Sequence, residues 1–274
     1  MGRETLDTSG YLYVKGKQKT TTQTTMKQIL LSIFILTSLA LNAQTVDKTQ
    51  RAIVTPANID SIIVYEKRFA ANDTILPPKN IAWFEYIKGT KNILVIAGHA
   101  TAQRRESKIK QADAGTGSLA IELNKLTNVA VLYTTYLSPS DPNFYDNNEF
   151  KDTLAKLLTE LKPILVIDLH GSQPFRPYDI DFGTMNGKSY LTRKDFLDSL
   201  KVAFHTESLS NQSQDYFSAE KNQTITKFVS SKGIPCIQLE INSNFLSADL
   251  GNIYGQQTAQ LLQALIRFIN ATTR

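Results

Sequence analysis

Two of the three histidines in this chain follow apolar, strand-like runs. His99 ends the segment ILVIAGH (93–99), and His170 ends the segment VIDLH (166–170). Near-continuous apolar runs of this kind are typical of central strands in a parallel sheet, and ligands bind at the carboxyl ends of such strands. Two neutral imidazoles at that edge, joined by a carboxylate, have the donor types of a catalytic zinc site with one open position. The pattern therefore predicts metal-assisted chemistry.

Two acidic residues follow the His99 strand closely enough to supply the third ligand. Glu106 lies in the basic segment RRESK (104–108), and Asp113 lies in ADAGTGSLA (112–120). Asp113 directly precedes glycines that open an expected helix, where N-terminal amides and the helix dipole favour a carboxylate. We therefore favour Asp113 as the ligand, with Glu106 as the alternative.

Two further acidic residues lie on the expected strands. Glu240 ends the apolar run GIPCIQLE (233–240). A carboxylate in that place costs free energy unless it has a partner or a function, so we predict that Glu240 is a general base, with a structural ion pair as the alternative. Asp168 precedes His170 by two residues, hence on one face of a strand, and either orients His170 or caps the strand end.

The spacing of apolar and turn residues predicts a single α/β domain over residues 50–274, with a mixed, mostly parallel sheet flanked by helices. The predicted strands are 61–66, 81–87, 92–97, 129–135, 163–168, 179–184 and 234–241. The predicted helices are 116–127, 148–161, 192–209, 222–232 and 255–271. His205 falls inside one of these helices and is interpreted as an ordinary helix residue.

The charge of the chain does not indicate a nucleic-acid partner. The formal net charge is +5, but residues 1–43 carry much of the excess, and the rest is close to neutral with no basic stripe. Residues 26–43 have the layout of a secretory signal peptide, and residues 1–25 read as a non-native or mis-called extension. We expect a periplasmic or secreted protein with no stable membrane anchor after cleavage. Cys236, the only cysteine, is expected to be a buried apolar residue.

Five motifs resemble the N-formylglutamate amidohydrolase family, whose phosphorylase/hydrolase-like fold is shared with zinc carboxypeptidases and aspartoacylases. The motifs are GHA (98–100), ADAGTGSLA (112–120), DLHG (168–171), DFGTMNG (181–187) and QLEIN (238–242). A strand-end histidine followed by an acidic residue ahead of a GT-led helix is also similar to phage poly-γ-glutamate hydrolases.

The resemblance implies a Zn²⁺ amidohydrolase with His99, Asp113 and His170 as ligands and Glu240 as base. Its expected substrate is a small molecule or peptide with an acidic group. The candidate substrate-binding residues are Arg104, Arg105, Arg176 and Asn242. A metallocarboxypeptidase or γ-glutamyl hydrolase acting on cell-wall peptides, and a non-catalytic binding protein of the same fold, are the alternatives.

Overall fold

Short segments rich in Val, Ile and Leu form the centre of a seven-stranded sheet in the computed structural model, which describes residues 52–273. The strands are β1 (Phe84–Ile87), β2 (Ile93–Ala97), β5 (Ala130–Thr134), β6 (Leu165–Ser172), β7 (Ile180–Gly183), β8 (Gln212–Gln214) and β9 (Cys236–Asn242). Every residue of β2 and of β5 is buried, as expected for strands covered on both faces. Residues 1–43, with the expected signal peptide, lie outside the described residues.

The strand order of the sheet is β1-β5-β2-β6-β9-β7-β8. Strands β5, β2, β6 and β9 run parallel to one another, whereas β1 and β7 pair antiparallel with β5 and β9. The prediction of a mixed, mostly parallel sheet is therefore confirmed. Because β2, β6 and β9 are neighbours with the same direction, their carboxyl ends meet at one edge of the sheet.

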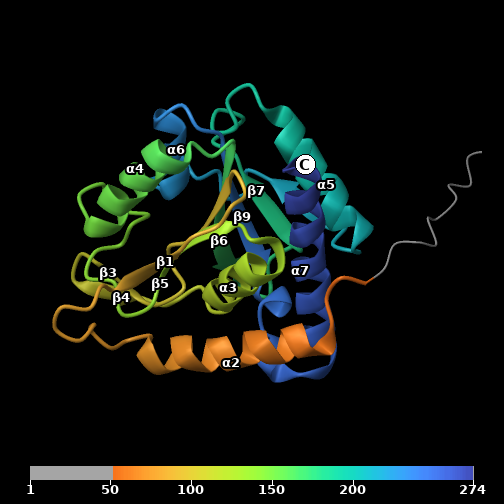
Figure 1. The fold of residues 1–274 in the computed structure, drawn as a ribbon, viewed down its shortest axis with the longest axis horizontal. Helices are drawn as coiled ribbons and strands as arrows, with labels where there is room; N and C mark the ends of the chain where they lie inside the picture. Colours follow the sequence, from red (N-terminus) through yellow and green to blue (C-terminus); the bar gives the residue numbers. More distant parts are fainter. Residues whose placement is uncertain (1–51, 274) are drawn as a thin grey trace, which may run out of the picture. The chain divides into compact units, whose positions relative to one another are not determined.

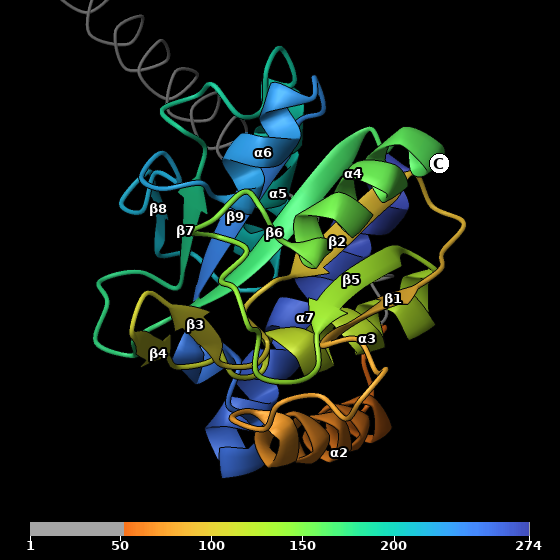
Figure 2. The same ribbon diagram turned by 90° about the vertical axis from the view of Figure 1, so that its left-hand side faces the viewer.

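Helices cover both faces of the sheet (Figures 1 and 2). They are α2 (Pro56–Asn72), α3 (Thr116–Thr127), α4 (Glu149–Leu161), α5 (Lys194–Thr206), α6 (Ile225–Ser231) and α7 (Asn252–Thr272). One apolar core contains residues of α2, α3, α5 and α7, and a second core on the other face contains residues of α4 and α6. This division explains why alternate residues of the central strands belong to different cores.

The prediction of a strand at 61–66 is wrong, because these residues lie inside α2. Pro56 occupies the first turn of this helix and Thr55 is its N-cap, which are strong start signals. Ile62 and Phe69 are buried at helical spacing, whereas Val64 is 62% exposed. The β-branched residues of SIIVYE therefore gave a misleading local signal, which the packing of one helical face overrode.

Three short strands were not predicted. Strands β3 (Gln103–Arg105) and β4 (Lys108–Lys110) form a separate antiparallel hairpin, and β8 extends the sheet beyond β7. Each has three residues and is polar, so its sequence lacks the apolar alternation that marks a strand. Within the described part of the chain, no helix has the length and apolar character needed to span a membrane.

Candidate functional site

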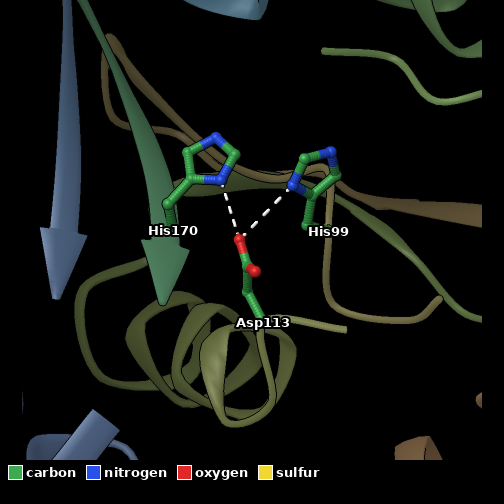
Figure 3. A group of neighbouring side chains, drawn as sticks. All are labelled: His99, Asp113 and His170. Atoms are coloured by element: carbon green, nitrogen blue, oxygen red, sulfur yellow. Dashed lines mark hydrogen bonds and ion pairs between the residues drawn. The ribbon is translucent and has the colours of Figure 1, made fainter. Parts of the chain in front are cut away.

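The side chains of His99, Asp113 and His170 meet at the carboxyl edge of the sheet (Figure 3). One oxygen of Asp113, Oδ2, lies 2.8 Å from Nδ1 of His170 and 3.3 Å from Nδ1 of His99. The three ligand atoms lie within 4.8 Å of one another, and both imidazoles are buried. The structure thus brings together the three residues that the sequence proposed as metal ligands.

The backbone around Asp113 fixes its distance from both histidines. The Asp113 N–H donates to the His99 carbonyl at 2.8 Å, and the Asp113 carbonyl accepts from the Thr116 hydroxyl at 2.7 Å at the start of α3. Gly115 adopts a φ of +86°, and a side chain there would meet the Leu246 carbonyl at 2.4 Å. The chain therefore turns sharply after Asp113, and only glycine fits the turn.

The helix amides do not hold the Asp113 carboxylate in the way the sequence suggested. Its oxygens contact the two histidines and, at 3.9 Å, the ammonium of Lys110, whereas the helix start binds the main-chain carbonyl. Glu106, the alternative ligand, lies exposed in the turn between β3 and β4, with a φ of +55°. Its carboxylate is not part of the His–Asp–His cluster.

Carboxylates also face the second ring nitrogen of each histidine. Nε2 of His99 lies 2.8 Å from Oδ1 of the fully buried Asp141, and Nε2 of His170 lies 3.5 Å from Oδ1 of Asp168. Both imidazoles therefore direct Nδ1 at the shared point and Nε2 at an acidic partner. Carboxylate–histidine pairs of this kind fix the ring orientation of metal ligands and increase their basicity.

Electrostatics favours the ionised forms of Asp113 and Asp141. Burial opposes the charged form of Asp113, yet hydrogen bonds with His170 and His99 and the charge of Lys110 hold its pKa well below the usual range. Burial likewise opposes the charge of Asp141, but the charge and hydrogen bond of His99 and the charge of Arg105 lower its pKa. Against the effect of burial, the charge of Asp168 and the hydrogen bond with Asp113 raise the pKa of His170 well above its ordinary value.

The donor set fits a zinc ion. Zinc bond lengths of about 2.0–2.1 Å to nitrogen and oxygen place tetrahedral ligand atoms roughly 3.3 Å apart. The two distances from Asp113 Oδ2 to the imidazole nitrogens, 2.8 and 3.3 Å, are close to that separation. Two nitrogens and one oxygen leave a fourth position open, as in catalytic rather than structural zinc sites.

Glu240 lies directly across from His170, because the register of β6 and β9 pairs these two residues. Burial raises its pKa from 4.5 to about 7, with His170 lowering it and Asp113 raising it to smaller extents. The amide of Gln238 donates to Oε1 of Glu240 at 2.9 Å. A carboxyl with this pKa exchanges its proton near neutral pH, which is what a general acid–base group requires.

A cavity of about 970 Å³ opens over this cluster, and two of the four candidate substrate-binding residues line it. Arg105 and Arg176 line the cavity, whereas Arg104 is exposed outside it. Asn242 is also outside the lining: its amide nitrogen lies near the carbonyls of Pro174, Arg176 and Tyr178, the closest at 3.1 Å. Asn242 therefore ties the β6–β7 loop to β9.

The two arginines of the cavity differ in their partners. Arg105 is bound to Asp141 through Nε at 2.9 Å and Nη2 at 2.6 Å, so its charge is already compensated. Arg176 lies over the rings of Phe175, Tyr216 and Phe217, with 5.0–5.6 Å between guanidinium carbon and ring centroid. Within residues 52–273 no carboxylate pairs with Arg176, and its buried Nε has no hydrogen-bond partner.

The sequence reasoning missed Asp141, Asn143 and Gln238. Asn143 sits between the imidazoles, with Nδ2 3.4 and 3.3 Å from the Nε2 atoms of His99 and His170, and its Oδ1 accepts from the amide of Ile225. Asp141 and Asn143 follow β5, whose carboxyl end lies at the same edge as those of β2 and β6. The rule that ligands bind at the carboxyl ends of parallel strands, which led to His99 and His170, thus also indicates the loop after β5.

A solved structure has the same fold. N-formylglutamate amidohydrolase from Ralstonia eutropha JMP134 aligns with a TM-score of 0.52 and 12% identity, over 70% of this chain and 100% of that chain. The gene product Atu2144 from Agrobacterium tumefaciens (TM-score 0.49, 13% identity, 70% of this chain and 96% of that chain) and a bacteriophage poly-gamma-glutamate hydrolase (0.45, 14%, 71% and 93%) are also similar. Neither a protein-family model nor a curated protein matches the sequence. The resemblance expected from the motifs is therefore confirmed for the fold.

The first prediction concerns the ligands. Protein purified without chelator should contain about one zinc per chain, and Asp113→Ala should weaken zinc binding far more than the matched change Glu106→Ala. Asp141→Asn should weaken zinc binding by ~10–100-fold, because the neutral amide lacks the negative charge of the acceptor that orients His99. Elemental analysis and competition with a chelator measure these effects. A larger loss in Glu106→Ala than in Asp113→Ala would assign the ligand to Glu106.

The second prediction concerns Glu240 in the metal-free protein. Because its folded-state pKa of about 7 exceeds 4.5, the folded protein keeps a proton that the unfolded chain releases, so stability falls as pH rises between these values. From about pH 4.5 to pH 8, the unfolding free energy of the parent should fall by ~3 kcal/mol more than that of Glu240→Gln. Urea unfolding measures this, with the exposed Glu160→Gln as control. If the unfolding free energies of the parent and of Glu240→Gln changed with pH in parallel, the carboxyl of Glu240 would have an ordinary pKa.

Proposed function

We propose that this protein is a zinc-dependent hydrolase that cleaves an amide bond in a substrate carrying an acidic group. The observation that carries the proposal is the convergence of His99, Asp113 and His170 beside Glu240 within one cavity. The fold shared with an N-formylglutamate amidohydrolase supports the same class of reaction. A binding protein derived from such an enzyme would be expected to lack a ligand or the base, and this chain retains all four.

Zinc, when bound, would polarise the substrate carbonyl and lower the pKa of water towards ~7. His99, Asp113 and His170 would hold the ion, and Asp141 would keep the His99 ring in the orientation that presents Nδ1. A carboxylate oxygen of Glu240 takes the proton of the attacking water as the new C–O bond forms. Glu240 then gives that proton to the amide nitrogen as the C–N bond breaks, so the base is restored.

Arg176 is the proposed anchor for the acidic group of the substrate. Its guanidinium has aromatic neighbours rather than a carboxylate partner, so a ligand carboxylate gains a two-pronged, charge-assisted contact. Phe175 and Tyr216, which flank it, are 76% and 53% exposed and extend the binding surface. Arg105 instead serves to hold Asp141.

The size of the cavity favours a peptide over a single acylated amino acid. Its volume of about 970 Å³ is at the upper end of the range of roughly 300–1,000 Å³ that accommodates drug-sized ligands. A γ-glutamyl or other acidic peptide fills such a space better than N-formylglutamate does. A peptidase acting on cell-wall fragments is therefore the second candidate, and it agrees with the export proposed from residues 26–43.

The third prediction distinguishes an active enzyme from a protein that binds zinc but catalyses no reaction. Glu240→Gln keeps the shape of the side chain but cannot take a proton, so zinc content should stay near normal while turnover falls by ~10²–10⁴-fold. The substrates to test are N-formyl-L-glutamate, N-acetyl-L-glutamate and a γ-glutamyl dipeptide. Turnover within about threefold of the parent would remove Glu240 from the mechanism. A lowered melting temperature with unchanged turnover would make it a structural residue.

The fourth prediction tests the anchor. Arg176→Met should raise KM for an acidic substrate by ~10–100-fold and change kcat much less, because a charge-assisted hydrogen bond contributes about 1.5–3 kcal/mol. The matched control is Arg104→Met, an exposed arginine outside the cavity. Steady-state kinetics on both variants decides the assignment. Equal KM values for the two variants would contradict a role for Arg176 in binding.

A further inference from the structure

Lys110 at the end of β4 is the one cation in the described chain whose charged group touches the ligand cluster. Its Nζ lies 3.1 Å from Nδ1 of His99 and 3.9 Å from Oδ1 of Asp113. Its charge also acts on Glu240. The side chain is 39% exposed and lines the cavity, so its ammonium has room to move without repacking the core.

The hydrogen bonds of His99 show where Lys110 stands relative to a bound ion. Nε2 of His99 faces Asp141, and Nδ1 faces both Asp113 and the Lys110 ammonium, which lies 3.1 Å away. A metal ion held by His99, Asp113 and His170 would also bind Nδ1 of His99, so it and the ammonium would compete for that atom. Backbone pairing with Gln103 holds Lys110 on the β3–β4 hairpin, so a displaced ammonium stays beside the ion.

We propose that Lys110 is a catalytic residue that contacts the carbonyl oxygen of the scissile amide and stabilises the negative charge that forms there. This inference rests on the proposed function. As the water oxygen bonds to the carbonyl carbon, the electron pair of the C=O double bond moves to oxygen, and Glu240 takes the proton. The pair returns as the C–N bond breaks and the nitrogen receives the proton.

The other cations of the cavity are less suited to this position. Arg105 is committed to Asp141, and Arg176 lies among aromatic rings. A donor placed where charge develops in a water-excluded site contributes ~10²–10³ to kcat, because it needs no reorganisation during the reaction. The ammonium of Lys110 lies beside the ligand cluster, 3.9 Å from Oδ1 of Asp113, and is not held by two hydrogen bonds to one carboxylate as Arg105 is.

The experiment compares Lys110→Met with Lys108→Met, an exposed lysine of the same strand, in the zinc-loaded protein. On the best substrate of the panel above, Lys110→Met should lower kcat by ~10²–10³-fold with little change in KM, and Lys110→Arg should restore part of it. Zinc affinity, measured by chelator competition, should rise about tenfold or more in Lys110→Met, because a repelling and competing cation is gone. Lys108→Met should change neither quantity.

Two results would overturn the role of Lys110 and leave the proposed function standing. One is a kcat for Lys110→Met within about threefold of that for Lys108→Met. The other is weaker zinc binding in Lys110→Met, which would make Lys110 a residue that positions Asp113. If the parent protein loads zinc but hydrolyses none of the substrates, the proposed function is rejected, and the catalytic role of Lys110 is rejected with it.

Discussion

The site depends on keeping several charged groups buried in one place with their charges balanced. Asp113, Asp141 and Asp168 surround two imidazoles, and Arg105 supplies a further positive charge at Asp141. A buried carboxylate without such partners would cost several kcal/mol of folding free energy or would take up a proton. The partners keep Asp113 and Asp141 ionised, and the three acids together hold both rings with Nδ1 towards one point. The contacts that balance the buried charges are therefore the same contacts that direct both Nδ1 atoms to the point where a cation would bind.

The register of the sheet, rather than a local sequence motif, brings the site residues together. Parallel neighbours β2, β6 and β9 end at the same edge, and residue-by-residue pairing sets His170 opposite Glu240 although they are seventy positions apart in the chain. The third ligand comes from the turn before α3, and its backbone bond to the His99 carbonyl holds that turn against the end of β2. The buried sheet and the turn before α3 thus place the three proposed ligands and Glu240.

The central sheet and the positions of His99, His170 and Glu240 could be predicted from the sequence, because apolar strands that end in His or Glu give a strong local signal. Asp113 was favoured over Glu106 only because it directly precedes the start of an expected helix. Helix α2 was missed because SIIVYE is β-branched and only tertiary packing decides its state. Asp141 was missed because it stands in an ordinary Asp-Pro turn, and its contact with His99 spans forty-two residues. The partners of Arg105 and Arg176 could not be predicted either. Arg105 lies on a polar strand of three residues and Arg176 lies in a loop, and neither segment has a periodic pattern in its sequence.

Asp141 joins the turn after β2 to the β3–β4 hairpin. One oxygen accepts from His99 in that turn, and the other binds Arg105 on the hairpin. This carboxylate adds to other contacts of the hairpin, in which the amide of Arg104 donates to the carbonyl of Ser138 and the Arg105 guanidinium lies over the ring of Phe144. Because one buried acid serves both the His99 ring and Arg105, a change that neutralises Asp141 would alter a proposed ligand and a cationic wall of the cavity together.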